Sequence, residues 1–513
     1  MLKKIRVAAA AFFMISLTLL FLDYTGTVHS YLGWSAKVQL VPAVLAGSAV
    51  IIVGLILITL IFGRIYCSAV CPLGIFQDVI SRLTNIGKKN RFSYRPPSKP
   101  LVTLRFVILG LFIFALIANI AVLTVFPVLL EPYSAYGRMI SQLFGPIYQW
   151  GNNLLARFAE RADSYAFYTV DVWLKSMAAL VVAGLTFVVI SVFAWKSGRG
   201  YCNTICPVGT LLAVITKFSF IKPPINKEKC GGCGLCAKNC KAGCIDPVNK
   251  EVDYLRCVSC CNCFGKCPKK AISFSLCNPL GAKKSTEQSI QKSKIPMTKI
   301  TANDAGRRNF ISASALFLLA CVTRIIGKTY DFDGGLAPLE DKKAPNRETP
   351  IIPPGADNVR LFRKHCTGCQ LCVSACPNQV LRPSGKLSSF MRPQMSFERG
   401  YCRPECVKCG QVCPTGAIRP ITTAEKSSIQ IGYAVWNKDL CVVNTDNVAC
   451  DLCSRKCPVG AITQIPKTDE PNSLKIPMII TNRCIGCGAC EHLCPARPYS
   501  AIYVEGVESH RVI

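Results

Sequence analysis

One stretch decides how the second half of the sequence is interpreted: Cys366-Thr367-Gly368-Cys369-Gln370-Leu371-Cys372-Val373-Ser374-Ala375-Cys376-Pro377. Three thiolates spaced at i, i+3 and i+6 can each bind one iron of a [4Fe-4S] cube, while a more distant Cys-Pro supplies the fourth ligand. The pattern recurs six times, with small variations, between residues 230 and 495. Disulfide frameworks and zinc sites do not account for six such repeats with a Cys-Pro at the end of most of them. The cysteines are therefore predicted to be cluster ligands.

The six motifs form three neighbouring pairs, and in such pairs the fourth ligand crosses from one motif to the other. The predicted ligand sets are Cys230, Cys233, Cys236 with Cys267; Cys257, Cys260, Cys263 with Cys240; Cys366, Cys369, Cys372 with Cys413; Cys402, Cys406, Cys409 with Cys376; Cys441, Cys450, Cys453 with Cys494; and Cys484, Cys487, Cys490 with Cys457. Cys244 is an alternative to Cys240, because Lys241 stands where the proline is expected. About six [4Fe-4S] clusters are predicted.

Four apolar runs without charges precede the cysteine motifs, and each is predicted to cross a bilayer as a helix. They cover residues 7–22, 41–62, 106–130 and 177–195. The 63–105 segment holds eight Lys and Arg residues, whereas a single Lys stands between the first and second runs. The positive-inside rule therefore predicts that the N-terminus, the 63–105 segment and the residues from 196 onward face the cytoplasm.

The second and fourth runs end in the same pattern, Gly-Arg-x-Tyr-Cys-x3-Cys-Pro-x-Gly, at residues 63–74 and 198–209. Two repeats of the same orientation imply a pseudo-two-fold axis along the membrane normal, which would bring Cys67, Cys71, Cys202 and Cys206 together. Our hypothesis is that these four thiols hold one further iron–sulfur or other metal centre. The alternative is that they only pack at helix ends, since a free cysteine behaves as a small hydrophobe.

Residues 306–327 contain Gly306-Arg307-Arg308-Asn309-Phe310-Ile311 ahead of an apolar run, and they resemble a twin-arginine export signal. We predict that this segment exports the folded domain behind it and stays in the membrane as a fifth span. The alternative is a buried helix with a basic start. Polar residues 278–305 and Pro-rich residues 328–355 are interpreted as linkers.

The predicted fold class is a membrane α-helical anchor, with four spans as a duplicated helix pair and a fifth span, joined to α+β ferredoxin domains of the bacterial 2[4Fe-4S] type. The anchor covers residues 1–222, a cytoplasmic two-cluster domain residues 223–277, and a periplasmic four-cluster domain residues 356–513. The expected location is the bacterial inner membrane. The formal net charge of +31 does not indicate nucleic acid as a partner, because cluster thiolates offset part of it and membrane topology accounts for much of the rest.

Other redox cofactors have no signature in the sequence. It contains no Cys-x-x-Cys-His for covalent haem, and His29 is the only histidine near a span. No Gly-x-Gly-x-x-Gly follows a strand pattern, so no flavin is predicted. The missing haem signatures likewise predict no haem. Glu131, Tyr133 and Arg138 follow the third run and either line a quinone pocket or anchor a helix at the membrane interface. No residue is predicted to be catalytic.

The order of these parts resembles a known family. Four spans, two Cys-x3-Cys-Pro motifs and a two-cluster domain resemble the NapH/MauN membrane ferredoxins, which are related to the NosR group. The sequence after Arg307 resembles their exported partners NapG and MauM, so the resemblance covers essentially the whole chain. It implies electron transfer from the (mena)quinol pool to a periplasmic oxidoreductase or carrier.

The resemblance also implies a quinol dehydrogenase-like component rather than a self-contained enzyme. The competing interpretation is an accessory protein that matures or protects a metalloenzyme. Lys241 after Cys240, the extra Cys244 and the eight-residue gap between Cys441 and Cys450 depart from the family pattern and leave individual ligands open.

Overall fold

The computed structural model describes residues 2–23, 25–84, 92–94, 96, 98–276, 340–470 and 473–513. The predicted linker 278–305, the twin-arginine segment 306–327 and the first part of the 328–355 linker lie outside the described residues. The end of the predicted 328–355 linker is part of the C-terminal domain. Ile351 and Ile352 are only 1% and 2% exposed. Burying these two apolar side chains in the core of the C-terminal domain is favourable, so this part of the segment is packed and not a spacer.

Among the described residues, three helices are long and apolar enough to cross a membrane: α1 (Leu2–Leu22), α8 (Lys99–Ala118) and α12 (Met177–Ser197). The second apolar run is divided into α4 (Leu40–Leu45) and α5 (Ala49–Phe62), and Gly47 between them has a φ of 68°. With 14 residues, α5 is shorter than the roughly 20 residues that a full crossing needs. The third run is divided into α8 and α9 (Val125–Leu130), because Asn119 ends α8 in a left-handed conformation. Four unbroken spans are therefore not confirmed.

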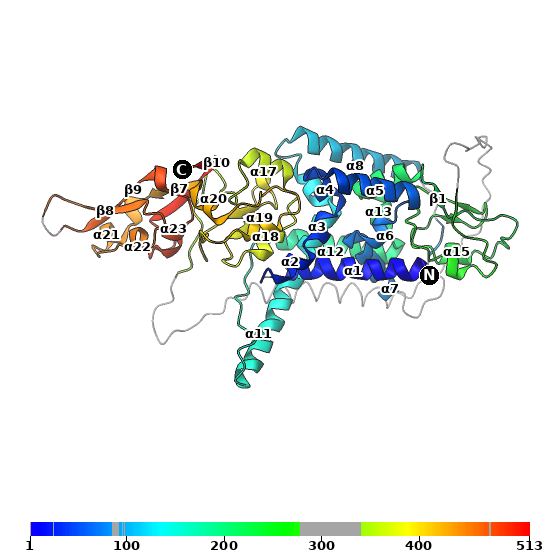
Figure 1. Ribbon diagram of the computed structural model, residues 1–513, viewed down its shortest axis with the longest axis horizontal. Helices are drawn as coiled ribbons and strands as arrows, with labels where there is room; N and C mark the ends of the chain where they lie inside the picture. The colour runs from blue at the N-terminus through cyan, green and yellow to red at the C-terminus, as the bar shows by residue number, and fades with distance from the viewer. Residues whose placement is uncertain are drawn as a thin grey trace.

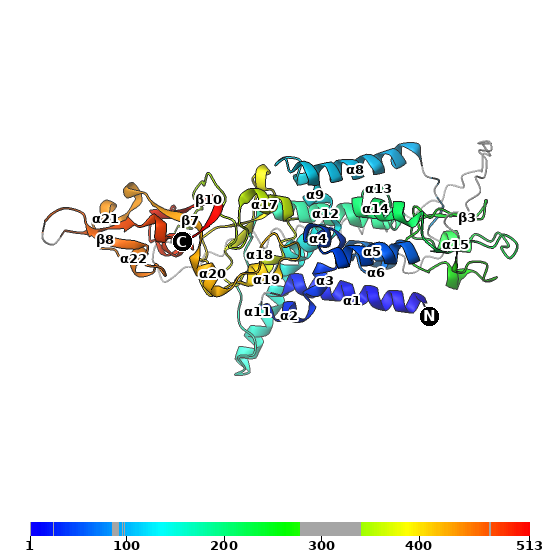
Figure 2. The same cartoon turned by 45° about the horizontal axis from the view of Figure 1, so that its top comes forward.

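The helices α1, α5, α8 and α12 run along the long axis of the molecule and, together with the shorter helices between them, form a bundle (Figures 1 and 2). Shorter helices fill its interior and its ends. They are α2 (Thr27–Leu32), α3 (Trp34–Lys37), α6 (Tyr66–Ala69), α7 (Pro72–Leu83), α10 (Pro132–Met139), the π-helix η1 (Ile140–Phe144), α13 (Gly200–Thr204) and α14 (Pro207–Thr216). Exposed apolar side chains such as Phe114 and Ile117 cover the outside of α8, as expected for a helix that faces lipid.

A small domain follows the bundle at the end where the N-terminus lies, on the right in Figure 1. Its first and last strands, β1 (Ile221–Lys222) and β4 (Ser275–Leu276), pair antiparallel and bring the two ends of the domain together. Between them lie α15 (Leu235–Lys238), the antiparallel pair β2 (Ile245–Asp246) and β3 (Glu251–Val252), and the 3₁₀-helix η2 (Phe264–Lys266).

The C-terminal domain is built around the antiparallel pair β7 (Ile429–Trp436) and β10 (Ile502–Val512). Next to the bundle lie α17 (Val359–His365), α18 (Leu371–Ala375), the pair β5 (Leu381–Pro383) and β6 (Pro393–Met395), η3 (Leu387–Ser389), α19 (Lys408–Val412) and α20 (Thr423–Ser428). Residues 438–500 extend away from the bundle and contain η4 (Lys438–Leu440), α21 (Val442–Thr445), α22 (Leu452–Arg455), the pair β8 (Ile462–Pro466) and β9 (Lys475–Ile479), η5 (Thr481–Arg483) and α23 (Ala489–Leu493). This excursion begins and ends at one place, since Asn437 N donates to Ala501 O at 2.7 Å.

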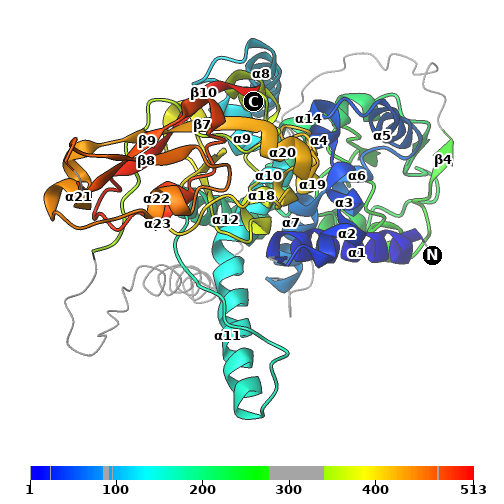
Figure 3. The same ribbon diagram turned by 60° about the vertical axis from the view of Figure 1, so that its left-hand side comes forward.

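The two cysteine-rich domains lie at opposite ends of the bundle (Figure 1). The C-terminal domain is held there by hydrogen bonds from Gln142 to Gln370 at 2.6 Å and from Lys175 Nζ to Val373 O at 3.1 Å. From the same end, α11 (Gly145–Arg161) projects away from the bundle (Figure 3) and exposes Trp150, Leu154 and Phe158. The bundle thus separates the two groups of predicted cluster ligands.

Candidate metal centres

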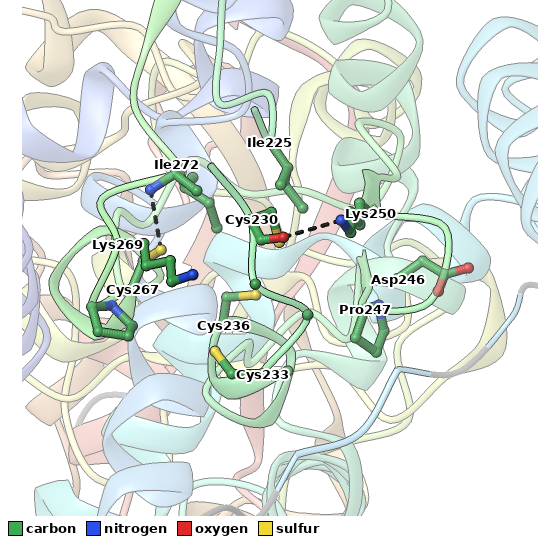
Figure 4. Close-up of a pocket in the computed structure, with 15 residues that line it drawn as sticks. Ile225, Cys230, Cys233, Cys236, Asp246, Pro247, Lys250, Cys267, Lys269 and Ile272 are labelled. Carbon is green, nitrogen blue, oxygen red and sulfur yellow. Dashed lines mark hydrogen bonds between the residues drawn. The ribbon is translucent and has the colours of Figure 1, made fainter. Parts of the chain in front are cut away.

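The first predicted ligand set surrounds one cavity of the small domain. Cys230, Cys233, Cys236 and Cys267 all line it (Figure 4). Ala271 N donates to Cys267 Sγ at 3.2 Å, and the side chain of Lys250 donates from Nζ to the backbone carbonyl of Cys230 at 3.0 Å. Such N–H···S hydrogen bonds favour thiolates that bind a cluster.

A second cavity of the small domain is lined by Cys257, Cys260 and Cys263 together with both Cys240 and Cys244. The sulfur atoms of Cys240 and Cys244 are 3.4 Å apart and both are buried. Either thiol is therefore placed to act as the crossing ligand, and the choice between them stays open.

In the C-terminal domain the structure brings together the sets that the crossed pairing predicts, each named here after its first cysteine. One cavity is lined by Cys376 with the three cysteines that begin at Cys402, and another by Cys494 with the three that begin at Cys441. Burial, followed by the charges of Cys366 and Cys413, raises the pKa of the Cys369 thiol. Burial, followed by the negative charges of the Cys484 and Cys457 thiolates, raises the pKa of the Cys487 thiol to about 12. Cys413 thus lies beside the Cys366 set, and Cys457 lies beside the Cys484 set.

The order of the four sets in space differs from their order in the sequence. The Cys366 set lies against the bundle, and Cys372 interacts electrostatically with Cys409 of the Cys402 set. Cys402 N donates to Cys487 O at 2.9 Å, so the Cys484 set comes next. The Cys441 set lies at the far tip, beside α21 and α22 (Figure 1). The third motif of the domain is therefore the outermost one.

The four thiols of the two Cys-x3-Cys-Pro motifs meet inside the bundle. Cys67, Cys71, Cys202 and Cys206, called the bundle cysteines below, are each 4% exposed. Cys71 interacts electrostatically with the thiols of Cys67, Cys202 and Cys206, so the four are neighbours. Two donors reach the sulfur atoms: Gln77 Nε2 lies 3.1 Å from Cys202 Sγ, and Gly209 N lies 3.3 Å from Cys206 Sγ.

The repeated arginines and glycines of the motifs explain how the two halves meet. Arg64 Nη2 donates to Cys202 O at 3.3 Å, and Arg199 Nη1 donates to Cys67 O at 2.6 Å. Each arginine therefore holds the backbone of the other motif, as a pseudo-two-fold arrangement requires. A Cβ on Gly74 or Gly209 would lie under 3.0 Å from the carbonyl oxygen of Cys67 or Cys202. No role was predicted for these arginines and glycines, although their repetition in both motifs is a signal that the sequence contains.

Buried positive charge surrounds the bundle cysteines. Arg64 and Arg199 are 0% and 1% exposed, and Arg6 and Arg105 are 7% and 6% exposed. Asp78 pairs with Arg199 at 2.8 Å and with Arg6 at 3.3 Å. Burial alone would raise the pKa of Asp78, but Arg199, Lys241 and Arg6 lower it to about 2. Among the described residues, no carboxylate lies within ion-pair distance of Arg64 or Arg105.

Buried cations without counter-ions are costly, so this surplus fits an anionic group held by the four thiols. A single metal ion fits less well than a cluster. Within the part of the chain that the structure describes, no three His, Cys, Asp or Glu side chains gather closely enough to hold one ion. In a cube each thiolate binds a different iron, so its ligands lie farther apart than those of one zinc ion.

The bundle cysteines are connected to the cysteine sets on both sides. Towards the small domain, Arg199 N donates to Lys241 O at 3.0 Å, and Lys241 follows Cys240 directly. Towards the C-terminal domain, Arg138 Nη1 donates to Gly368 O at 3.3 Å, next to Cys369. Arg138 Nη2 also reaches Leu129 O at 3.3 Å, and Tyr201 Oη reaches Leu130 O at 3.4 Å, beside Cys202.

Glu131, Tyr133 and Arg138 do not lie on the surface of the bundle as interfacial anchors would. They are 1%, 1% and 0% exposed and lie between the bundle and the C-terminal domain. Glu131 caps α10, accepting hydrogen bonds from the backbone N–H groups of Tyr133 and Ser134. The helix-anchor interpretation missed this burial, because it depends on where the C-terminal domain docks.

Comparison with protein-family models agrees with this grouping. Residues 45–91 and 177–226 match the 4Fe-4S binding domain, and residues 365–417 and 448–497 match the 4Fe-4S dicluster domain. The first match includes the bundle cysteines, and the second includes every predicted ligand of the C-terminal domain except Cys441. The chain therefore contains 4Fe-4S-binding domains in both halves.

Several ferredoxin-type proteins are similar to part of the chain. The methylamine utilization ferredoxin-type protein MauM of Methylobacillus flagellatus is 33% identical over 169 residues, which are 31% of this chain and 70% of that protein. The ferredoxin-type protein NapG of Haemophilus influenzae is 32% identical over 174 residues, covering 31% of this chain and 61% of NapG.

The ferredoxin-type protein NapF of Escherichia coli is 32% identical over 162 residues, covering 31% of this chain and 87% of NapF. No solved structure gives a significant match to the chain. The shared 4Fe-4S domains and the extent of these alignments show that the chain belongs to the family of ferredoxin-type iron–sulfur electron-transfer proteins that includes MauM and NapF.

Proposed function

We propose that this chain conducts electrons between the (mena)quinol pool and a periplasmic oxidoreductase or carrier, through six [4Fe-4S] clusters and one further centre at the bundle cysteines. The observation that carries the proposal is the position of the bundle cysteines between the Cys257 and Cys366 sets. A centre there would join two groups of sites that are otherwise separated by the bundle.

When bound, the clusters would act as one-electron carriers, and the polypeptide holds them and stabilises their charge. The cysteines hold them as thiolates, while backbone N–H groups such as Ala271 N and Gly209 N donate to the sulfur atoms. The bundle excludes water from its four thiols, and Arg64 and Arg105, which have no carboxylate partner among the described residues, would offset the negative charge that such a centre carries.

The arrangement of the domains supports an electron-transfer protein with cluster sites on both sides of the membrane. The cysteine-rich domains occupy opposite ends of the bundle. The positive-inside prediction assigns the small-domain end to the cytoplasm, so the C-terminal domain would face the periplasm. A partner would then meet the chain at the outermost set, the Cys441 set.

The alternative function is an accessory protein that matures or protects a metalloenzyme. An accessory role needs no continuous series of sites across a bundle. The series that runs from the Cys230 set to the Cys441 set therefore favours conduction over an accessory role.

Reduction by quinol tests the proposal. The purified chain with oxidised clusters is mixed with menaquinol, and its cluster absorbance and electron paramagnetic resonance spectra are followed in time. We expect rapid reduction in the parent. In a Cys67→Ala/Cys202→Ala variant we expect clusters of only one domain to be reduced. Clusters that stay oxidised in the parent would support the accessory role.

A further inference from the structure

A helical hairpin leaves the bundle at the end where the C-terminal domain docks. It consists of α11 and residues 162–176, called the return segment below, which lead into α12 (Figure 3). Leu143, two residues before α11, packs with Leu180 and Ala183 near the beginning of α12. Since α12 is long and apolar enough to cross a membrane, its beginning marks the membrane boundary. The hairpin therefore leaves and rejoins the bundle at that boundary.

The axis of α11 crosses the direction of the membrane-spanning helices. α1, α8 and α12 run along the long axis of the molecule, whereas α11 projects to the side (Figures 1 and 3). A helix that crosses the membrane normal at the boundary lies along the membrane surface. The C-terminal domain lies beyond the boundary, because its Met391 packs with Ala179 in the first turn of α12. The C-terminal domain and the lipid are thus on opposite sides of the plane in which α11 lies.

The return segment covers one face of α11. Asn152 Nδ2 donates to Tyr168 O at 2.8 Å. The Asn153 side chain forms two hydrogen bonds with the backbone of Val170, both at 2.8 Å. Ala156, one turn further along the same face, is 4% exposed. This face of α11 is therefore already packed against the chain itself.

The return segment is also attached to the C-terminal domain. Trp173 Nε1 donates to Gln379 Oε1. The guanidinium groups of Arg382 and Arg399 lie over the Trp173 ring, 4.3 and 4.9 Å from its centroid. The face of α11 that the return segment covers is thus on the side of the C-terminal domain. The opposite face is on the side of the lipid.

That opposite face is apolar and exposed. It consists of Ile147, Leu154, Leu155 and Phe158, called the apolar stripe below, which follow one another at helical spacing. Leu154 and Phe158 are exposed by 56% and 58%. Contiguous exposed apolar side chains on a helix mark a surface that binds a membrane or a protein. The stripe therefore needs an occupant.

The residues beside the apolar stripe favour lipid as the occupant. Tyr148 and Trp150 stand at its two edges, and aromatic side chains with a polar tip are enriched at the membrane interface. Arg157 and Arg161 are exposed, and their long side chains can extend from the helix to lipid phosphates. A stable protein interface needs roughly 800 Å² from each partner, which the four side chains of one isolated stripe do not supply.

We propose that α11 is an interfacial helix that binds the lipid surface on the side of the C-terminal domain, with its apolar stripe among the acyl chains. The lipid-facing surface of the bundle continues onto it, because α11 contacts α1, whose Ile15 and Leu19 are exposed. Through Trp173 the same hairpin holds the C-terminal domain, so it fixes the position of that domain relative to the membrane surface. This role is independent of electron conduction.

Photocrosslinking from the apolar stripe tests the assignment. The photoreactive residue p-benzoylphenylalanine replaces Leu154, Phe158 or Glu160 in the full chain with its clusters, in nanodiscs of phosphatidylcholine and phosphatidylglycerol. Adducts formed on illumination are identified by mass spectrometry. We expect about tenfold more lipid adducts from positions 154 and 158 than from position 160, since only the stripe lies among the acyl chains. Glu160 is the matched control, because it is exposed but follows Ala156 by one turn on the other face.

Two results of this experiment would overturn the proposal. Crosslinks from positions 154 and 158 to a second copy of the chain would assign the stripe to a dimer interface. Equal yields of lipid adducts at all three positions would show that the stripe does not face lipid.

Proteolysis gives a second test that needs no photoreactive residue. Leu154→Gln/Phe158→Gln keeps residues that favour helix but removes the apolar stripe. We expect trypsin to cleave the variant after Arg157 and Arg161 about fivefold faster than the parent in nanodiscs, because the hairpin is no longer held on the surface. Cleavage at the parent rate would contradict the proposal. Cluster absorbance equal to that of the parent establishes that the variant is folded.

Discussion

Arg199 Nη1 lies 2.6 Å from the carbonyl oxygen of Cys67, so the second Cys-x3-Cys-Pro motif holds the backbone of the first. The same guanidinium pairs with Asp78, with Nε at 2.9 Å and Nη2 at 2.8 Å from its carboxylate. Both side chains are buried. This pair therefore joins the two halves of the bundle around the bundle cysteines.

Removing Arg199 should destabilise the bundle strongly, because Asp78 would lose its main counter-ion while it stays buried. We expect Arg199→Met to cost about 3 kcal/mol in the free energy of unfolding. The double variant Arg199→Met/Asp78→Asn should cost less than the sum of the two single changes. Denaturation followed by tryptophan fluorescence in detergent measures these values. Additive costs would show that the two residues act independently.

Adding a methyl group to the motif glycines should prevent the two halves from closing. In Gly74→Ala and Gly209→Ala the new Cβ would collide with the carbonyl oxygen of Cys67 or Cys202. We expect either variant to lower the thermal midpoint and to lose iron. Gly54→Ala in α5 is the control, since a Cβ there meets nothing within 4 Å. Parent-like midpoints for the two motif variants would contradict the observed packing.

Iron analysis tests the seventh centre directly. We expect Cys67→Ala/Cys202→Ala to contain about four fewer iron atoms per chain than the parent, as the loss of one [4Fe-4S] cluster requires. Cys261→Ala should keep all its iron, because this buried thiol lines the cavity of the Cys257 set but is not one of its predicted ligands. Equal iron in the parent and the double variant would rule out a centre at the bundle cysteines.

The spatial order of the outer sets predicts different effects for two ligand substitutions. Cys487→Ser should disrupt the third site from the bundle, so electrons from menaquinol should not reach the Cys441 set. Cys450→Ser should disrupt only the outermost site and leave the Cys484 set reducible. Electron paramagnetic resonance after limited reduction distinguishes the two variants. If the clusters followed sequence order, the two patterns would be exchanged.

His510 should make the C-terminal domain sensitive to acid. Burial lowers the pKa of His510 to about 4, although Asp357 opposes this, and neither ring nitrogen has a hydrogen-bond partner among the described residues. The unfolded chain, with an ordinary histidine pKa of about 6.5, binds this proton first, so stability falls as the pH drops below that value. We expect a loss of about 1 kcal/mol between pH 7 and pH 5.5. His510→Gln should remove most of this pH dependence in thermal unfolding; an unchanged slope would assign it to other groups.

The local grouping of the cysteines could be predicted from sequence, because i, i+3 and i+6 spacing within one short loop sets where the sulfur atoms lie. Cys413 beside Cys369 and Cys494 beside Cys453 follow the expected crossing. The choice between Cys240 and Cys244 could not be predicted, and their 3.4 Å separation leaves it open.

Other features depend on tertiary contacts that no local pattern encodes. Gly47 and Asn119 divide two apolar runs that hydropathy alone treats as continuous. The docking of Gly368 on Arg138 buries Glu131 and Tyr133, which sequence could only place near a membrane interface. The outermost position of the Cys441 set arises because residues 438–500 fold outward and return.

That excursion has a consequence for how such proteins can diversify. All eight predicted ligands of the Cys441 and Cys484 sets lie within residues 438–500, and Asn437 and Ala501 at its base are hydrogen-bonded to each other. A short turn between those two residues would give a shorter protein with the same membrane half and two fewer centres. Under the proposed function, replacing the excursion would change the site that meets the partner and leave the membrane half as it is. Residues 438–500 are thus a segment that can be exchanged while the rest of the chain is kept.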